Sequence, residues 1–463
     1  MARENTPPPG SALAETFAAW ALALDAAAIP NAVRETATRA LVDHVGLTVS
    51  ARDEPYVRAI AASWDGTGPC TAFGHAEGLD LAGAALVNGT AAHGEDYDDT
   101  FEGSPVHTSA VIVPAVLAAA ERFGLAGDDV LRGMVVGTEL MCRMAVVAPT
   151  AQHRAGFHPT AIIGAMGAAA AVSTALRLTP AAMTDALGVA GSFASGIIEY
   201  LAEGTWTKRI HPGWAAQAGL RAALLGRAGF KGPRTVFEGE HGFFFAFGVP
   251  QIPPDLSRLT DGLGTDWYAG RIAFKPYACG TMVQPFIDCA IALAGRGIRA
   301  ADVTDVLCRV GEGTVHRLWE PLAEKRRPST PYSAKFSVPF GVAVGLIDRK
   351  AGLGQFTDDR IADPAVLDLA GRVRYEIDPD DEYPRNYSGT VTVTLQDGST
   401  HTARQPHLRG GVRETLDMAE IEAKFRANCR HGGWSDAQIT DCLAVLAGLF
   451  GAPDMGALAR FRG

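Results

Sequence analysis

A short charged loop between two apolar segments constrains this chain more than any other feature. The loop spans residues 93–107, where five acidic side chains fall within eight residues and a histidine stands at each end. The flanking segments, residues 81–92 and 108–120, are rich in alanine and typical of buried helices. Because unpaired charge is costly to bury, the loop either faces solvent and caps the helix ends or forms a site with paired charges. The loop alone leaves both interpretations open. The acids are Glu95, Asp96, Asp98, Asp99 and Glu102, and the histidines are His93 and His107.

Hydrophobic periodicity predicts that the first 250 or so residues are helical almost throughout. Helices are expected at about 12–28, 32–50, 55–64, 79–93, 108–123, 127–147, 159–177, 180–193 and 212–228. Glycine and alanine recur within them, as at Gly164 and Gly167, and permit close approach of neighbouring helices. The glycine spacing matches no dinucleotide or phosphate-binding motif.

The character of the chain changes near residue 270. Alternating apolar residues predict strands at 303–310, 372–377 and 390–395, and Asp397-Gly398 predicts a hairpin turn that returns through residues 399–404. Further helices are expected at about 284–296, 337–349 and, after Ser435 as N-cap, 436–449. We therefore predict a mainly α protein with an inserted α+β domain. The helical domain takes residues 1–269 and 405–463, and the α+β lid domain takes residues 270–404.

Composition narrows the possible partners. The 463 residues exceed what one hydrophobic core needs, in agreement with two domains. The net charge of −10 and the lack of a Lys/Arg-rich block argue against nucleic acid, so an anionic substrate must depend on a few well-placed cations.

Cysteine usage and apolar runs indicate the compartment. The seven cysteines are scattered and form no C-x-x-C pair, which favours reduced thiols in a cytoplasm over a zinc or disulfide framework. Residues 1–10 lack an apolar signal core, and no apolar run is long enough to span a bilayer. We expect a soluble, cytoplasmic protein without a membrane partner.

Three predicted helices begin beside a histidine or a lysine. His158-Pro159 opens one helix, residues 208–212 (Lys-Arg-Ile-His-Pro) open another, and His107 opens the helix after the acidic loop. Free N–H groups at a helix start attract carboxylate and phosphate groups. A His-Pro pair is usually only a cap, so the recurrence rather than any single pair points to a site. Lys275, at the start of the α+β domain, either reaches such a site or is an exposed hinge residue.

Five segments together carry a resemblance to a known family. They are residues 87–100 (VNGTAAHGEDYDDT) with His107 and Pro114, residues 156–160 (GFHPT), residues 204–214 (GTWTKRIHPGW), residues 275–277 (KPY) and residues 334–337 (AKFS). On these motifs the chain resembles the MmgE/PrpD family, which includes 2-methylcitrate dehydratase, cis-aconitate decarboxylase and iminodisuccinate epimerase. The resemblance runs in register from about residue 12 to about residue 450.

The resemblance implies a helical domain built from both chain ends, a smaller α+β lid, a homodimer, a pocket between the domains, and neither a metal nor an organic cofactor. It implies three catalytic residues, His107, His158 and Asp96, and three substrate-binding residues, Thr100, Lys208 and Lys275. The lysines would hold carboxylates, one histidine would move a proton beside a carboxylate, and Asp96 would orient its histidine or assist a leaving hydroxyl. The remaining acids of the loop, Asp98, Asp99 and Glu102, are assigned to capping and domain contacts.

The implied substrate is a small di- or tricarboxylic acid. We expect a hydro-lyase that dehydrates a 2-methylcitrate-like acid, with decarboxylation of a cis-aconitate-like acid or epimerisation of an iminodisuccinate-like acid as alternatives, and a non-catalytic scaffold as a distant one. The chain departs from the family pattern at three positions. Thr108 stands where proline is common, Gln284 where many members carry histidine, and Phe340 where decarboxylase-like members carry tyrosine. The last two departures leave the acid–base residues open and argue against decarboxylation.

A rival interpretation uses the same loop. Residues 98–102 (Asp-Asp-Thr-Phe-Glu) match the D-D-x-x-E pattern with which all-helical terpene cyclases hold magnesium and a diphosphate. Such cyclases need a second metal motif on a later helix, and the sequence has none. The inserted α+β domain would also be unexplained.

Overall fold

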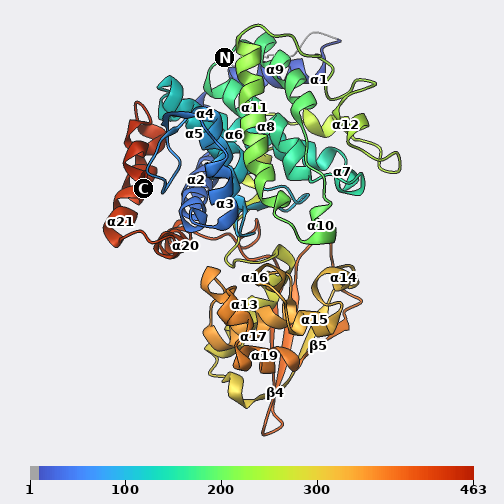
Figure 1. Ribbon diagram of the computed structural model, residues 1–463. Coiled ribbons are helices and arrows are strands. Elements are labelled where there is room, and N and C mark those ends of the chain that lie inside the picture. The colour runs from blue at the N-terminus through green and yellow to red at the C-terminus, as the bar shows by residue number, and fades with distance from the viewer. Residues whose placement is uncertain (1–9) are drawn as a thin grey trace. The chain divides into compact units, whose positions relative to one another are not determined.

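The computed structural model describes residues 10–463, and these divide into two compact units (Figure 1). The helical unit contains the described residues up to Gly94, then Asp98–Ile272 and Met418–Gly463. The α+β unit contains Ala273–Asp417 together with the short segment Glu95–Tyr97. The prediction of a mainly α protein with an inserted α+β domain is confirmed. The expectation about a signal core concerns residues that, up to residue 9, lie outside the described part of the chain.

The helical unit has the helices that periodicity predicted, with small shifts at their ends. The longer ones are α1 (Leu13–Ala23), α2 (Asn31–Ala51), α3 (Pro55–Ala62), α4 (Leu81–His93), α5 (Ser109–Phe123), α6 (Gly127–Val147), α8 (Pro159–Ala175), α9 (Pro180–Phe193), α11 (Thr207–Arg227), α20 (Met418–His431) and α21 (Asp436–Gly448). The shorter ones are α7 (Ala151–Arg154), α10 (Tyr200–Glu203) and α12 (Phe243–Ala246), and two short strands are β1 (Thr67–Cys70) and β2 (Thr100–Phe101).

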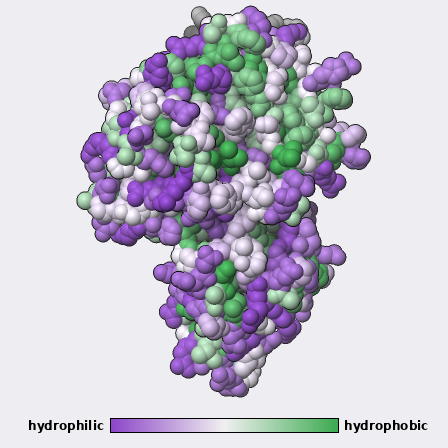
Figure 2. All heavy atoms as spheres, viewed as in Figure 1, coloured by the Kyte–Doolittle hydropathy of each residue, from purple (hydrophilic) through white to green (hydrophobic). Residues whose placement is uncertain are grey.

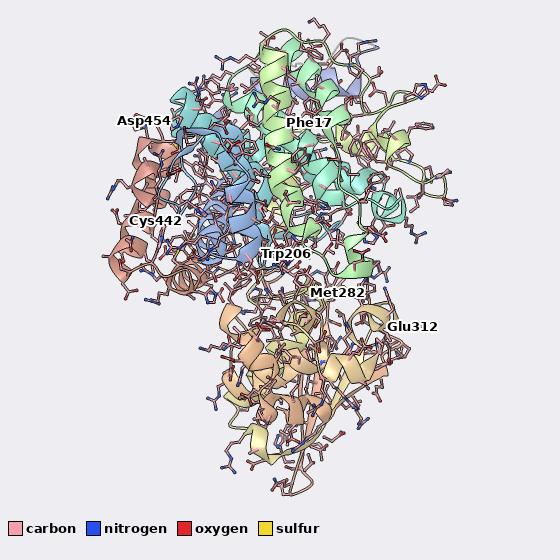
Figure 3. All side chains as sticks on the ribbon, viewed as in Figure 1. Phe17, Trp206, Met282, Glu312, Cys442 and Asp454 are labelled. Atoms are coloured by element: carbon pink, nitrogen blue, oxygen red, sulfur yellow. The ribbon has the colours of Figure 1, made fainter. Side chains whose placement is uncertain are left out.

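The core of this unit is built around α8, which is buried along its whole length and packs against α6 and α11 (Figure 1). Small residues make the close packing possible, as predicted. A Cβ atom on Gly167 would lie 2.3 Å from the Met141 side chain of α6, and one on Gly219 of α11 would lie 2.4 Å from the Ala165 carbonyl. Fully buried Phe17 of α1 adds to this core (Figure 3).

Two helix ends differ from the prediction for identifiable reasons. The helix expected at 12–28 is interrupted, because Asp25 accepts a hydrogen bond from the Ala27 N–H and starts a separate 3₁₀ turn over Ala26–Ala28. The helix expected from residue 212 begins at Thr207, so Pro212 lies inside it. Proline here removes only the donor that would bond to the Lys208 carbonyl, a modest loss close to a helix start.

The α+β unit is a four-stranded sheet with helices packed on it. Its strands are β4 (Val303–Val310), β5 (Val373–Ile377), β6 (Gly389–Leu395) and β7 (Thr400–Gln405), in the order β5-β4-β6-β7. The β4–β5 pair is parallel and the other two pairs are antiparallel. The larger helices are α13 (Gln284–Gly295), α17 (Val338–Asp348) and α19 (Pro364–Gly371), and the smaller are α14 (Val315–Leu318), α15 (Leu322–Arg326), α16 (Pro331–Ala334) and α18 (Asp358–Ile361).

The predicted strand faces hold at the centre of the sheet and fail at its edge. Val391 and Val393 of β6 are fully buried, whereas Ile377, at the end of edge strand β5, is 43% exposed. The unit begins at Ala273, in the short strand β3 (Ile272–Ala273), and runs past the predicted end at residue 404. The segment after residue 404 belongs to the α+β unit because the backbone N–H of Phe274, near the start of the unit, donates to the Gly410 carbonyl at 2.9 Å.

Two observations bear on the expected compartment. All seven cysteines are buried and none forms a disulfide. Among residues 10–463, no helix combines the length and the apolar character that crossing a bilayer requires. The cytoplasmic location itself stays a prediction.

Candidate active site

Four buried histidines gather in the helical unit, and we call them the histidine cluster. His93 is the last residue of α4, His107 stands two residues before α5, His158 is the N-cap of α8, and His211 lies in the second turn of α11. The ring centroids are 4.8 Å apart for His93 and His107, 5.7 Å for His93 and His158, and 5.2 Å for His158 and His211. Four helices distant in sequence thus bring titratable rings to one place.

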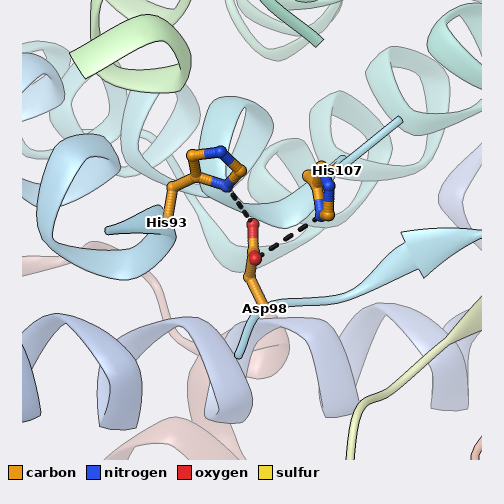
Figure 4. Close-up of side chains that lie close together, drawn as sticks. All are labelled: His93, Asp98 and His107. Atoms are coloured by element: carbon orange, nitrogen blue, oxygen red, sulfur yellow. Dashed lines mark hydrogen bonds and ion pairs between the residues drawn. The ribbon is translucent and has the colours of Figure 1, made fainter. Parts of the chain in front are cut away.

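Asp98 connects two of these rings (Figure 4). Its carboxylate, which is fully buried, lies 2.7 Å from His93 Nδ1 and 3.4 Å from His107 Nδ1. His107 Nδ1 also lies 2.7 Å from the backbone carbonyl oxygen of Asp99. A carbonyl oxygen only accepts hydrogen bonds, so His107 Nδ1 carries a proton and Nε2 is the atom that gains or loses one. A histidine oriented by a carboxylate and a carbonyl is suited to proton transfer.

Asp99 has a different role from Asp98, although the two are adjacent and both are buried. Its carboxylate accepts hydrogen bonds from Thr108 N and Oγ1, at 3.0 and 2.7 Å, and from Ser109 N and Oγ. These groups start α5, so the predicted capping role of Asp99 is confirmed. The same assignment for Asp98 is wrong, because Asp99 already fills the cap and Asp98 binds the histidines instead. Burial, and then the neighbouring Asp98, raise the pKa of Asp99.

His158 and His211 form a second pair. Their Nδ1 atoms are 3.1 Å apart, and the backbone N–H of His158 donates to the Gly196 carbonyl at 2.9 Å. Burial lowers the pKa of His158 well below its usual value, and the charges of His93, His211 and Lys208 act in the same direction. The pKa of His211 is lowered to about 4, again first by burial. Both rings are therefore neutral at neutral pH.

Two further predicted site residues, Lys208 and Thr100, belong to the helical unit. Lys208 is half-buried in the first turn of α11, where its positive charge lowers the pKa of both His158 and His211. Thr100 is buried in β2. Another buried threonine, Thr160 of α8, accepts a hydrogen bond through its hydroxyl from the His107 backbone N–H at 3.2 Å.

The remaining predicted residues, Asp96 and Lys275, are found together in the α+β unit. Lys275 is buried and its Nζ donates to the Asp96 carbonyl at 2.7 Å, while Asp96 has a left-handed backbone with φ of 53°. Lys335 holds the preceding residue, Glu95, through its carbonyl at 2.7 Å and through an ion pair with its carboxylate. Lys275 is thus no exposed hinge residue. The expected pairing of Asp96 with a histidine, and a pocket between the domains, stay predictions.

Three residues of the cluster region have the side chains of a metal site. Among residues 10–463, the donor atoms of His93, Asp98 and His107 all lie within 4.8 Å of one another. Two imidazoles and a carboxylate suit zinc or another first-row divalent ion. The hydrogen bond to the Asp99 carbonyl already accounts for His107 Nδ1, so an ion there would have to displace that proton. This grouping differs from the prediction, which assigned no ligands to a metal.

Sequence reasoning also missed three site residues, His93, Asp98 and His211. All three lie in the segments that carried the family resemblance, and His93 and Asp98 belong to the charged loop itself. The sequence gives the types and positions of these three residues, but it does not show which side chains they contact in the fold.

An open pocket of about 470 Å³ adjoins the cluster within the helical unit. It is lined by residues of α10, α11 and the segment before them, including Gly196, Glu203, Tyr200, His211 and Trp214. His211 therefore belongs both to the cluster and to the pocket wall.

A helical unit built from both chain ends, an inserted α+β unit and a carboxylate–histidine centre define a class of two-domain proteins equipped for acid–base chemistry. The chain belongs to the MmgE/PrpD family. The N-terminal domain of that family matches residues 15–253 and the C-terminal domain matches residues 277–445.

Three similar proteins are named as cis-aconitate decarboxylases or as like them. The chain is 30% identical over 434 residues to cis-aconitate decarboxylase of Aspergillus terreus, covering 88% of this chain and 87% of the relative. It is 31% identical over 358 residues to the human cis-aconitate decarboxylase, covering 74% and 72%. A cis-aconitate decarboxylase-like protein of Aspergillus oryzae is 28% identical over 424 residues, covering 86% and 87%.

Proposed function

We propose that this protein is a lyase that decarboxylates an unsaturated tricarboxylic acid resembling cis-aconitate. The observation that carries the proposal is His107, whose Nδ1 lies 2.7 Å from the Asp99 carbonyl and 3.4 Å from the Asp98 carboxylate, so that Nε2 is the nitrogen that exchanges a proton with a substrate. The names of relatives that cover most of the chain support the substrate class. They favour decarboxylation over the dehydration that the sequence alone suggested.

The reaction breaks one C–C bond and consumes one proton. Carbon dioxide leaves from the saturated CH₂–COO⁻ arm, and the bonding electron pair forms a new double bond to the central carbon. The former double bond then places negative charge on the carbon beside the other carboxylate, as an enolate-like state. A protonated histidine adds a proton to that carbon. Catalysis therefore needs cations near the carboxylates and one acid near the carbon.

The roles follow from charge and hydrogen bonding. His107, stabilised as an imidazolium by Asp98, delivers the proton. His158 is neutral, so it holds a substrate carboxylate as a hydrogen-bond donor. Lys208 supplies positive charge at the start of α11. Thr100, Asp96 and Lys275 complete the proposed site as substrate contacts and supports, and no metal or organic cofactor is invoked.

Dehydration of a 2-methylcitrate-like acid is the second candidate, and two residues favour it. Phe340 is fully buried and its ring centroid lies 5.9 Å from that of Phe356, so a core phenylalanine stands where decarboxylase-like members of the family carry a tyrosine. Gln284, where many members carry histidine, is also fully buried and bonds only weakly to the Cys279 carbonyl, at 3.4 Å. Neither residue can move a proton.

The test is NMR of the product in deuterium oxide, with cis-aconitate, citrate, methylcitrate and aspartate-derived acids as substrates. Decarboxylation of cis-aconitate should give one deuterium on the carbon that accepts the proton. His107→Gln should lower kcat about 10²–10⁴-fold with little change in KM, whereas His158→Gln should act mainly through KM. Turnover of methylcitrate alone would replace the proposal by the second candidate, and no turnover of any acid would favour a scaffold.

We also infer a homodimer through the helical unit. Apolar side chains are exposed on the segment from α9 to α11, among them Ile197 (62%), Leu201 (61%), Trp206 (52%) and Trp214 (44%). Figure 2 shows apolar patches on this unit, and Figure 3 shows Trp206 at the start of α11. Such surface is uncommon on a monomer. Light scattering after size-exclusion chromatography should give twice the chain mass, and the mass of one chain would reject the inference.

A further inference from the structure

We propose that His211 is a positioning residue that acts through His158, by fixing which nitrogen of His158 carries the proton. The proposal rests on the function proposed above, because it concerns how His158 holds a substrate carboxylate. It gives a role to a residue that belongs to the 204–214 segment but has no role in the proposed function.

The contact between the two rings requires unlike partners. The Nδ1 atoms are 3.1 Å apart, a hydrogen-bond distance, so one nitrogen must donate and the other must accept. Two neutral imidazoles meet this condition in only two ways. Either His211 donates and His158 carries its proton on Nε2, or His158 donates and its Nε2 is bare.

The proposed role of His158 selects between these arrangements. A carboxylate accepts hydrogen bonds and donates none, so the nitrogen that faces it must carry a proton. Because His158 Nδ1 faces His211, the nitrogen left for the substrate is Nε2. His211 must therefore be the donor, with its proton on Nδ1. A bare Nε2 on His158 would repel a carboxylate instead of holding it.

The surroundings of His211 fit this arrangement. A Cβ atom placed on Gly196 would lie 3.3 Å from His211 Nε2, so the outer nitrogen of His211 faces the loop that lines the 470 Å³ pocket. A water molecule held in a pocket of this volume can donate to that bare nitrogen. Gly196 has φ of 131°, which side chains rarely adopt, and its missing Cβ leaves room beside the nitrogen.

The charged and titratable groups near the pair favour the neutral form of both rings. Lys208 lies three residues before His211 on α11, His93 comes from α4, and Tyr200 from α10 contacts both rings, with centroids 6.1 and 5.8 Å away. The lysine and the other histidines oppose added positive charge. Glu203 also lines the pocket but is exposed. His211 thus acts as a fixed neutral donor.

Two substitutions separate positioning from packing. His211→Asn keeps an N–H donor near the place of Nδ1, and His211→Leu fills similar space without one. We expect KM to rise about tenfold or more in His211→Leu and to stay within about threefold of wild type in His211→Asn, with kcat changed less than KM in both. His241→Leu, at an exposed histidine, is the matched control. An equal rise of KM in both His211 variants would show that His211 acts only through packing. An unchanged KM in both would reject the proposal.

A spectroscopic measurement tests the same point without substrate. In protein labelled with ¹⁵N-histidine, His158 should show a protonated Nε2 and an unprotonated Nδ1 that accepts a hydrogen bond, and His211 the reverse. His211→Leu should shift the His158 Nδ1 resonance, and His211→Asn should largely restore it. The opposite tautomers would overturn the inference about His211 alone, whereas inactivity of the wild type on the acid panel would overturn the proposed function alone.

Discussion

Replacing Asp98 by asparagine is the most direct test of the histidine centre. The Asp98 carboxylate lies 3.4 Å from His107 Nδ1, and at an effective dielectric constant of about 20 a carboxylate stabilises an imidazolium near that distance by about 4 kcal/mol. An asparagine has no charge, so the protonated form of His107 loses that stabilisation. A loss of about 4 kcal/mol corresponds to about 10³ in rate, and the retained bond to the Asp99 carbonyl lowers the expected effect to about 10²–10³ in kcat.

The assay is steady-state decarboxylation on folded protein, with circular dichroism and the melting temperature measured beside it. Asp99→Asn is the contrasting variant, because Asp99 is equally buried and adjacent but caps α5. It should lower stability by about 1 kcal/mol or more and lower kcat far less than Asp98→Asn does. A folded Asp98→Asn enzyme with kcat within tenfold of wild type would refute the role of the carboxylate.

The remaining predictions concern binding, metal dependence and acid stability. Lys208→Met and Lys275→Met should each raise KM about tenfold to hundredfold. Lys275→Met should also lower stability, because the Nζ of Lys275 donates to the Asp96 carbonyl. Unchanged steady-state kinetics in either variant would remove that residue from the site. Activity should survive exhaustive EDTA treatment, and activity lost and then restored by one divalent ion would make His93, Asp98 and His107 a functional metal site. Burial lowers the pKa of His44 to about 3, so the unfolded chain binds a proton more tightly and stability is lost as pH falls from about 6.5. Urea titrations at pH 7 and pH 5 measure how much the free energy of unfolding falls with pH. The fall should be about 2 kcal/mol smaller in His44→Leu than in wild type. An equal fall in both proteins would show that His44 is protonated in the fold.

Much of the fold follows from local sequence patterns. Helix lengths, the Ser435 cap and the strands of the α+β unit depend on periodicity, capping and turn residues, which act over a few positions. The error at α11 has the same local nature. The predicted start at Pro212 is wrong, because Thr207 begins the helix and Pro212 fits within its first turns.

The site was only partly predictable because its pairings are not local. Asp98 and Asp99 are chemically identical neighbours, and only the backbone path decides that one meets two histidines while the other caps α5. His211 meets His158 because α8 and α11 pack together across 53 positions of sequence. The family resemblance supplied residue types for the site, and the structure supplied these partners.

Decarboxylation and dehydration place opposite demands on the same histidine, and this difference separates them by pH. Decarboxylation ends with a proton added to carbon and consumes one proton per turnover, so His107 must start as an imidazolium. Dehydration begins with removal of a proton beside a carboxylate, so His107 must start neutral, and the proton returns as the hydroxyl leaves as water. Asp98 favours the imidazolium form of both rings beside it, His93 and His107, whereas His158 and His211 are neutral. We therefore expect kcat for cis-aconitate to fall toward alkaline pH, with the limb lost in His107→Gln. A rate that instead falls toward acid pH, on folded enzyme, would show that His107 works as a base, the state that dehydration of a hydroxy acid requires.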